Sequence, residues 1–191
     1  MRKFLSSLIA LAAVAATSVS FATETVTREH GIGGDCAKIR GHLVVEGPVG
    51  AGATGPGWVE IKGVRLEGTY SLLAIPDVNA VRVDPATGVV QFTSHGYGKF
   101  ESGDNVIFSI NVTLYTSRPD TPGLFDVYGA SVSGPAFMAS PDYPSWGSGA
   151  FAYAQLSMQS RGTFQQIGDM GYGEFTIEDG TICNVDWKAL K

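Results

Sequence analysis

Side chains that could do catalytic or metal chemistry are scattered along this 191-residue sequence. The histidines are His30, His42 and His95, and none has a second histidine two or four residues away. A metal site on one strand or helix needs such paired ligands. Isolated histidines are more often surface residues or hydrogen-bonded core residues. We therefore expect no metal site.

Three further segments come close to a known motif. Residues 129–134 (GASVSG) approach a nucleophile elbow, but the second glycine comes one place late and no βα unit follows. Residues 31–35 (GIGGD) lack the glycine spacing and the following helix of a phosphate-binding loop. Residues 77–79 (DVN) begin like a calcium loop whose other ligands are missing. We expect no cofactor and assign no catalytic residue.

An aromatic loop over residues 141–147 (PDYPSWG) is the best binding candidate. Tyr143 and Trp146 lie in a loop stiffened by Pro141 and Pro144. Stiffened aromatic side chains bind a protein, a sugar or a small molecule at little entropic cost. We predict Tyr143, Trp146 and Trp58 as ligand-binding residues. The alternative is that the loop folds back as a lid on one end of the core and that Trp58 plugs a barrel end.

The only cysteines, Cys36 and Cys183, lie far apart in the sequence. In an oxidising compartment such a pair indicates one disulfide, and closing a loop of this length stabilises the fold by up to ~5 kcal/mol in the chain-entropy model. Neither cysteine lies in a CxxC motif or next to a histidine, which argues against redox or nucleophilic chemistry. We predict a structural bridge that joins the first and last strands.

The first 22 residues have the order of a secretory signal peptide. Arg2 and Lys3 precede an apolar stretch over residues 4–16, and small residues follow it up to Ala22. The apolar run is shorter than the roughly 20 residues that span a bilayer, and no later segment is long and apolar enough to do so. We predict cleavage after Ala22 and a secreted or periplasmic protein that does not span the membrane; an uncleaved anchor is the alternative.

Composition narrows the class of the mature chain. Loss of Arg2 and Lys3 lowers the formal net charge of −5 by two, so the charge disfavours nucleic acid and anionic membrane surfaces as partners. All 25 glycines lie beyond residue 22, roughly twice the usual share. We expect a loose segment over residues 23–35 and one β domain over residues 36–191.

Short strands separated by turns account for most of that domain. The clearest is 105–116, where Val106, Phe108, Ile110, Val112 and Leu114 alternate with more polar residues. This period of two predicts an antiparallel strand with one buried and one wetter face. Further strands are expected over residues 39–46, 58–66, 69–75, 78–83, 89–101 and 124–133, with a bulge at Gly63. Residues 47–57 and 134–149 are predicted to be loops. Residues 151–158 fit either a strand or a short helix.

Turn residues predict the hairpins. The Asp84–Gly88 segment (DPATG) has the proline and glycine of a tight turn. Asp179-Gly180 between residues 172–177 and 181–187 predicts a terminal hairpin. The pentapeptide GYGKF at 96–100 recurs as GYGEF at 171–175, and we interpret its glycines as relieving crowding beside an aromatic residue on a curved sheet.

The strand count of about nine to eleven predicts an all-β fold, either an antiparallel β-barrel or a two-sheet β-sandwich. An outer-membrane barrel is a competing architecture, because its strands also alternate. Residues 41–48 (GHLVVEGP) resemble a strand of allene oxide cyclase-type barrels, and the resemblance covers those eight residues. It implies a barrel of calycin or cyclase size, in which catalysis depends on a shaped apolar cavity.

Three functions fit these features. The first is a secreted, non-catalytic binding protein whose barrel or sandwich holds a small apolar ligand or docks on a surface partner. The second is a pocket-type enzyme, such as a cyclase or isomerase. The third is a structural or assembly subunit of a cell surface. Fold alone does not choose between them, since function depends on the site.

Overall fold

Antiparallel strands dominate the computed structural model, which describes residues 35–134 and 147–190. They contain no α-helix and none of their helical segments is long and apolar enough to cross a membrane. The elements are β1 (Cys36–Pro48), β2 (Ala53–Ile61), β3 (Val64–Pro76), the 3-10 helix η1 (Val78–Ala80), β4 (Arg82–Val83), β5 (Val90–Ser102), β6 (Asn105–Ser117), β7 (Leu124–Ser133), β8 (Gly147–Ser148), the 3-10 helix η2 (Gly149–Phe151), β9 (Gln155–Ile167) and β10 (Met170–Cys183).

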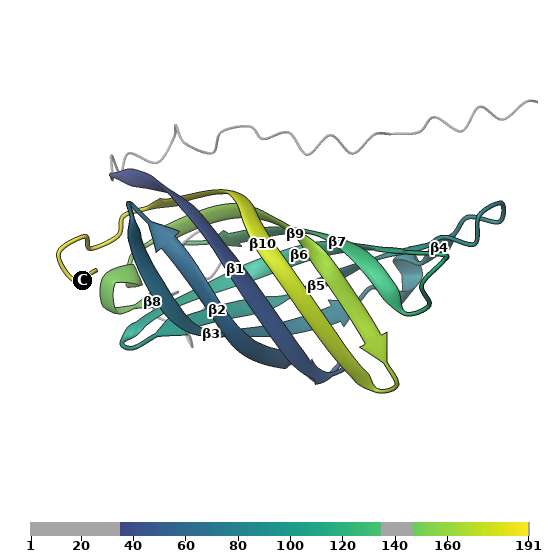
Figure 1. The fold of residues 1–191 in the computed structure, drawn as a ribbon. Coiled ribbons are helices and arrows are strands. Elements are labelled where there is room, and N and C mark those ends of the chain that lie inside the picture. Colours follow the sequence, from purple (N-terminus) through teal and green to yellow (C-terminus); the bar gives the residue numbers. More distant parts are fainter. Residues whose placement is uncertain (1–34, 135–146, 191) are drawn as a thin grey trace, which may run out of the picture. The chain divides into compact units, whose positions relative to one another are not determined.

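Eight of these strands close into a barrel. Their order is β5–β3–β2–β1–β10–β9–β7–β6, and β6 pairs back with β5 (Figure 1). The short strands β4 and β8 add to β5 and β6. The predicted all-β class is confirmed, and of its two architectures the barrel is the one formed. Closure pairs the first and last strands, so every long strand has two neighbours.

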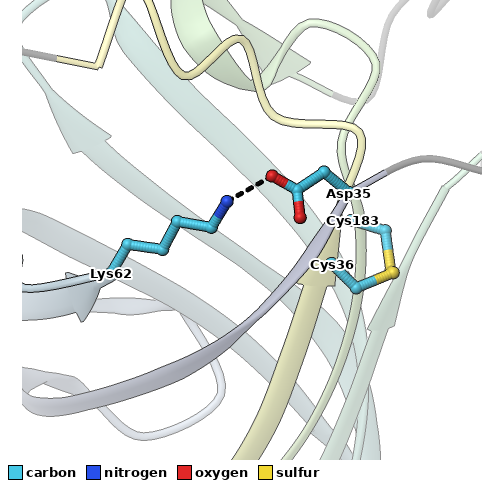
Figure 2. Close-up of a disulfide and its surroundings, with 4 residues drawn as sticks. All are labelled: Asp35, Cys36, Lys62 and Cys183. Carbon is cyan, nitrogen blue, oxygen red and sulfur yellow. Dashed lines mark hydrogen bonds and ion pairs between the residues drawn. A yellow bond between two sulfur atoms is a disulfide. The ribbon is translucent and has the colours of Figure 1, made fainter.

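The predicted disulfide lies at this closing seam. Cys36 and Cys183 are opposite one another in the register of β1 and β10, and their sulfur atoms are bonded (Figure 2). Asp35, next to Cys36, forms an ion pair with Lys62 in the turn between β2 and β3. The bridge therefore joins residues at the two ends of the barrel sequence, as the spacing of the cysteines predicted.

Two predictions that depended on glycines are wrong, a loop over residues 47–57 and a bulge at Gly63. Residues 53–57 belong to β2, although 47–57 was predicted as a loop. A Cβ on Gly55 would lie 2.5 Å from the carbonyl oxygen of Val44, so this close approach of β1 and β2 requires glycine. Gly63 is not a bulge: with Lys62 it forms the two-residue turn between β2 and β3, and both residues have positive φ.

The predicted terminal hairpin is also wrong. Strand β10 continues through Asp179 and Gly180, where the register to β9 shifts at a bulge. The chain instead reverses at Gly168–Asp169, between β9 and β10. Residues 78–83 form η1 and β4 rather than one strand, and residues 151–158 are divided between η2 and β9.

Strand β6 is in the predicted place, but its more polar face is the buried one. Ser109, Asn111 and Thr113 point into the barrel and are at most 8% exposed. Val112 and Leu114, on the alternate face, are 37% and 38% exposed. Successive side chains of a strand point to opposite faces, so barrel closure places the apolar face of β6 outside.

The two ends of the barrel differ. At the closed end, η2 and the segment after β10 cover the interior, and Phe151, Val185 and Leu190 are buried there. This end also carries the disulfide and the C-terminus (Figure 1). At the open end lie the turns β1–β2, β6–β7 and β9–β10, together with the segment that contains η1 and β4.

Candidate functional site

A pocket of about 140 Å³ opens into the barrel interior at the open end. We call it the mouth pocket. Its wall comes from all eight barrel strands and from the turn between β1 and β2. The lining residues are Val45, Gly47, Pro48, Val49, Gly50, Gly52, Ala53, Leu72, Ala74, Pro76, Phe92, Ser94, Tyr115, Phe125, Phe164, Gln166, Gly171 and Phe175.

Four aromatic side chains form one side of the pocket, and we call them the aromatic quartet: Phe92, Tyr115, Phe125 and Phe164. Two of the pairs are opposite one another in strand register, Phe92 with Tyr115 and Phe125 with Phe164. The rings of Phe92 and Tyr115 stack with their centroids 4.6 Å apart, and Phe125 meets both edge-on. The phenylalanines of the quartet are only half-buried, so their rings face an opening rather than a filled core.

Glycines on β10, the strand next to Phe164, leave space beside these rings. A Cβ on Gly171 would lie 2.6 Å from the ring of Phe164, and one on Gly173 would lie 2.7 Å from the ring of Phe175. Gly171 and Gly173 belong to the second copy of the repeated pentapeptide. The interpretation that these glycines relieve crowding beside an aromatic residue agrees with this geometry.

Polar side chains are few in the mouth pocket. Among its described lining residues they are Ser94, Tyr115 and Gln166, and none of the lining side chains carries a charge. Ser94 and Tyr115 are 2% and 5% exposed, whereas Gln166 is exposed at the rim and donates to the carbonyl of Gly168 at 3.1 Å. Burial raises the pKa of the Tyr115 hydroxyl, and its interaction with Ser94 opposes that shift.

A smaller polar chamber of about 20 Å³ lies deeper in the barrel and shares Leu72, Tyr115 and Phe175 with the mouth pocket. That volume holds about one water molecule. Its polar side chains are Tyr70, Asn111, Thr113, Ser131 and Ser160.

The amide of Asn111 organises this polar chamber. With its oxygen toward the backbone nitrogen of Gly98, at 3.1 Å, the amide nitrogen donates to Ser131 Oγ at 2.7 Å and to Ser109 Oγ at 2.9 Å. The Tyr70 hydroxyl lies 3.3 Å from the same amide. Burial raises the pKa of Tyr70 to about 12, so its hydroxyl stays protonated at physiological pH. The buried amide of Asn111 is thus satisfied by Ser109 on its own strand and by groups on neighbouring strands.

The outer surface of the barrel has two contrasting flanks. The charged flank, on β1, β2, β9 and β10, carries the ion pairs Arg40–Glu60, Arg161–Glu178 and Lys38–Asp179 and the His42–Glu174 hydrogen bond. The apolar flank, on β3, β5, β6 and β7, exposes Leu73, Ile75, Tyr97, Val112, Leu114 and Tyr128. Its members are neighbours across the strands, since Leu73 is opposite Tyr97 and Leu114 is opposite Tyr128.

The predicted binding residues are not brought together in the described part of the chain. Trp58 lies on the outer surface of β2, where the guanidinium of Arg65 is 4.1 Å from its ring centroid, and it does not line the mouth pocket. Tyr143 and Trp146 lie outside the described residues. Within the described ranges no three His, Cys, Asp or Glu side chains gather as metal ligands.

Sequence reasoning did not identify the aromatic quartet. Each of its residues lies near the open end of a long strand, in the same phase as the buried residues of that strand. The signal in the sequence is therefore an aromatic residue at the last inward-facing position of a strand. It can be used only once it is known which alternate residues of the strand face inward.

Comparison with protein-family models, curated proteins and solved structures found no match to this chain.

Proposed function

We propose that the protein is a secreted binding protein that holds a small apolar ligand in the mouth pocket. The observation that carries this proposal is the pocket itself, which is lined by the aromatic quartet and by glycines. A concave, mostly apolar cavity with a few polar groups is the usual form of a small-molecule site, and barrel mouths are a frequent place for one.

The volume sets the size of the enclosed group. An apolar protein cavity of about 150 Å³ binds benzene, and the mouth pocket measures about 140 Å³. One aromatic ring therefore fits inside, with any larger part of the ligand extending through the opening. Offset-stacked or edge-to-face contacts with the quartet would favour an aromatic ring over an aliphatic group of equal size by about 1 kcal/mol.

The polar groups of the pocket favour binding over turnover. Acid–base catalysis near neutral pH needs a group whose pKa lies near the working pH. Tyr115 is the titratable side chain among the described lining residues, and its pKa is raised from 10.0. Its hydroxyl therefore stays neutral and can hold a ligand without exchanging a proton with it.

Export supports the same proposal. The disulfide is consistent with an extracytoplasmic location, and the first 22 residues have the pattern of a cleaved signal peptide. Mass spectrometry of the protein secreted by its host tests both points. The denaturing mass should show cleavage after Ala22 and the loss of two protons on disulfide formation.

The same experiment under native conditions tests binding. We expect extra mass that is present only under native conditions, from a non-covalent ligand that is recovered unchanged. In NMR titrations with toluene, residues of the mouth pocket should shift. Gly171→Ala should weaken binding several-fold, because its Cβ would lie 2.6 Å from the ring of Phe164 and force that lining ring to move. Val112→Ala, on the apolar flank, serves as the control and should leave toluene affinity unchanged.

Chemical conversion of a recovered ligand would favour the pocket-type enzyme instead. A mouth pocket that binds neither toluene nor any ligand from the host would contradict the proposal.

The apolar flank favours a second candidate function, assembly through the barrel wall. Clustered exposed apolar side chains mark an interaction surface. Those of the apolar flank extend over four neighbouring strands, with the exposed His95 between Ile75 and Val112. Sedimentation of the mature protein at increasing concentration tests it. We expect association that Leu114→Lys weakens and that Thr176→Lys, on the charged flank, does not. A protein that stays monomeric throughout would argue against assembly from identical copies.

A further inference from the structure

The mouth pocket is apolar except at one buried point, where Ser94 on β5 meets Tyr115 on β6. Gln166, the other polar side chain of the pocket, is at the exposed rim and already donates to the Gly168 carbonyl. Ser94 and Tyr115 are almost fully buried, yet both line the cavity. Any polar atom of a ligand that goes deep into the pocket will therefore meet this pair of hydroxyls.

Counting donors shows what the pair can bind. A serine and a tyrosine hydroxyl together have two O–H donors. One hydrogen bond between them uses one donor, which leaves the second donor and several lone pairs for another partner. That partner must contain an acceptor, as a hydroxyl, carbonyl or ether oxygen does. A ligand with only carbon and hydrogen would leave the remaining donor unsatisfied, which is unfavourable for a buried group.

A charged ligand group is disfavoured beside the same two hydroxyls. None of the described lining side chains is a cation or an anion, and moving an ionised group from water into an apolar site without a counter-ion costs several kcal/mol. A carboxylate therefore cannot use the hydroxyl pair as well as a neutral oxygen can. The half-buried rings of the quartet would contact the apolar part of the same ligand.

We propose that Ser94 and Tyr115 form the polar anchor of the mouth pocket, which selects an uncharged, single-ring ligand with a hydroxyl or carbonyl oxygen on the ring. This inference rests on the proposed binding function and adds the chemical class of the ligand. The ring lies against the aromatic quartet, and its oxygen points inward to the two hydroxyls.

Three probes of similar size test the anchor: phenol, toluene and benzoate, titrated at pH 7 into the oxidised mature protein and followed by NMR. We expect phenol to bind more tightly than toluene, although toluene is the more apolar probe, and benzoate to bind at least about tenfold more weakly than phenol. In Tyr115→Phe and in Ser94→Ala the preference for phenol over toluene should fall by about three- to tenfold, the value of one net hydrogen bond.

Tyr70→Phe is the matched control, because it removes the same hydroxyl from a residue that does not line the mouth pocket. It should leave the ratio of phenol to toluene affinity unchanged. Circular dichroism of each variant checks that the barrel is folded. If Tyr115→Phe does not fold, Ser94→Ala still tests the anchor.

The outcomes separate the two proposals. Equal preference for phenol in the wild type and in both anchor variants overturns the anchor and leaves the binding function standing. Benzoate that binds as tightly as phenol also overturns the anchor. If phenol and toluene both fail to bind, the mouth pocket is not a site for single-ring ligands and the anchor is overturned. The binding function fails with it if no ligand from the host occupies the pocket either.

Discussion

The closed and open ends of this barrel are made from the same eight strands but are finished in opposite ways. At the closed end Phe151 is 1% exposed, and Val185 and Leu190 pack beside it after the last strand. At the open end Phe92 and Phe125, also inward residues, are half-buried because nothing described in the structure covers them. Apolar side chains thus fill one end of the barrel, whereas aromatic side chains line a pocket at the other.

Cross-links follow the same division. The Cys36–Cys183 bridge and the Lys62–Asp35 ion pair both lie at the closed end (Figure 2). Lys62 also lies 4.0 Å from the ring centroid of Trp187 there. We infer that stability is concentrated at the closed end, which leaves the open end free to expose apolar surface to a ligand. Sites commonly occupy such less stable regions of a fold.

The largest effect should come from Phe151→Ala at the closed end. Removing a fully buried ring leaves a cavity, and we expect a loss of about 3 to 5 kcal/mol in the free energy of unfolding. Urea denaturation followed by circular dichroism measures it. A loss below about 1 kcal/mol would mean that this end is not the stable one.

Removal of the disulfide should have the second-largest effect on stability. Replacing both cysteines, as Cys36→Ala with Cys183→Ala, should lower the free energy of unfolding by about 2 to 5 kcal/mol. Hydrogen exchange should rise first at the paired ends of β1 and β10. Binding of toluene should remain within about twofold of the wild type, since the mouth pocket lies at the other end; a large loss of affinity would show that the two ends are coupled.

A ring at the open end should matter less for stability and more for binding. For Phe92→Ala we expect a loss of about 1 to 2 kcal/mol, because the side chain is only half-buried and its main specific contact is the stack on Tyr115. Denaturation and toluene titration are measured on the same sample. A stability loss as large as that of Phe151→Ala would erase the difference between the ends.

The smallest effect concerns the open-end ion pair Arg118–Asp126, in which Arg118 Nη2 donates to Asp126 Oδ1 at 2.6 Å. The guanidinium holds the pKa of Asp126 below its ordinary value of 3.8. A carboxylate with a lowered pKa in the folded state stabilises the protein above pH 3.8, and this contribution is lost as the pH falls through the lowered pKa.

A double-mutant cycle with Asp126→Asn and Arg118→Gln measures that pair. The coupling should be small at pH 7, since both side chains are exposed and solvent screens them. It should vanish in acid, below the lowered pKa. Equal coupling at pH 7 and in acid would show that the interaction does not depend on the charge of Asp126.

Strands with regular alternation could be predicted from the sequence almost to the residue. Leu124–Ser133 has the predicted bounds, and Asn105–Ser117 extends its prediction by one residue. Predictions failed where glycine has two possible uses. Gly55 and Gly180 lie within strands, at positions where neighbouring atoms leave no room for a Cβ and so require glycine. Local sequence rules instead interpret such glycines as turn residues.

The candidate site was beyond prediction for a different reason. Phe92 and Tyr115 belong to hairpin arms whose positions were predicted, but local alternation does not say which face of an arm is inside. On β6 the more apolar face is the outer one, so polarity favours the wrong choice. The mouth pocket also needs Phe164 and Gly171, whose strand and turn were not predicted with the right bounds.

By itself the sequence determined the all-β class, most strand positions and the disulfide, because these depend on local alternation and on the count of cysteines. Only the tertiary structure decided that the sheet closes on itself, which face of each strand is enclosed and which end is covered. The physical reason is that a strand pattern repeats every two residues, so both faces remain available until pairing with distant strands selects one. The mouth pocket and its Ser94–Tyr115 pair follow from that selection.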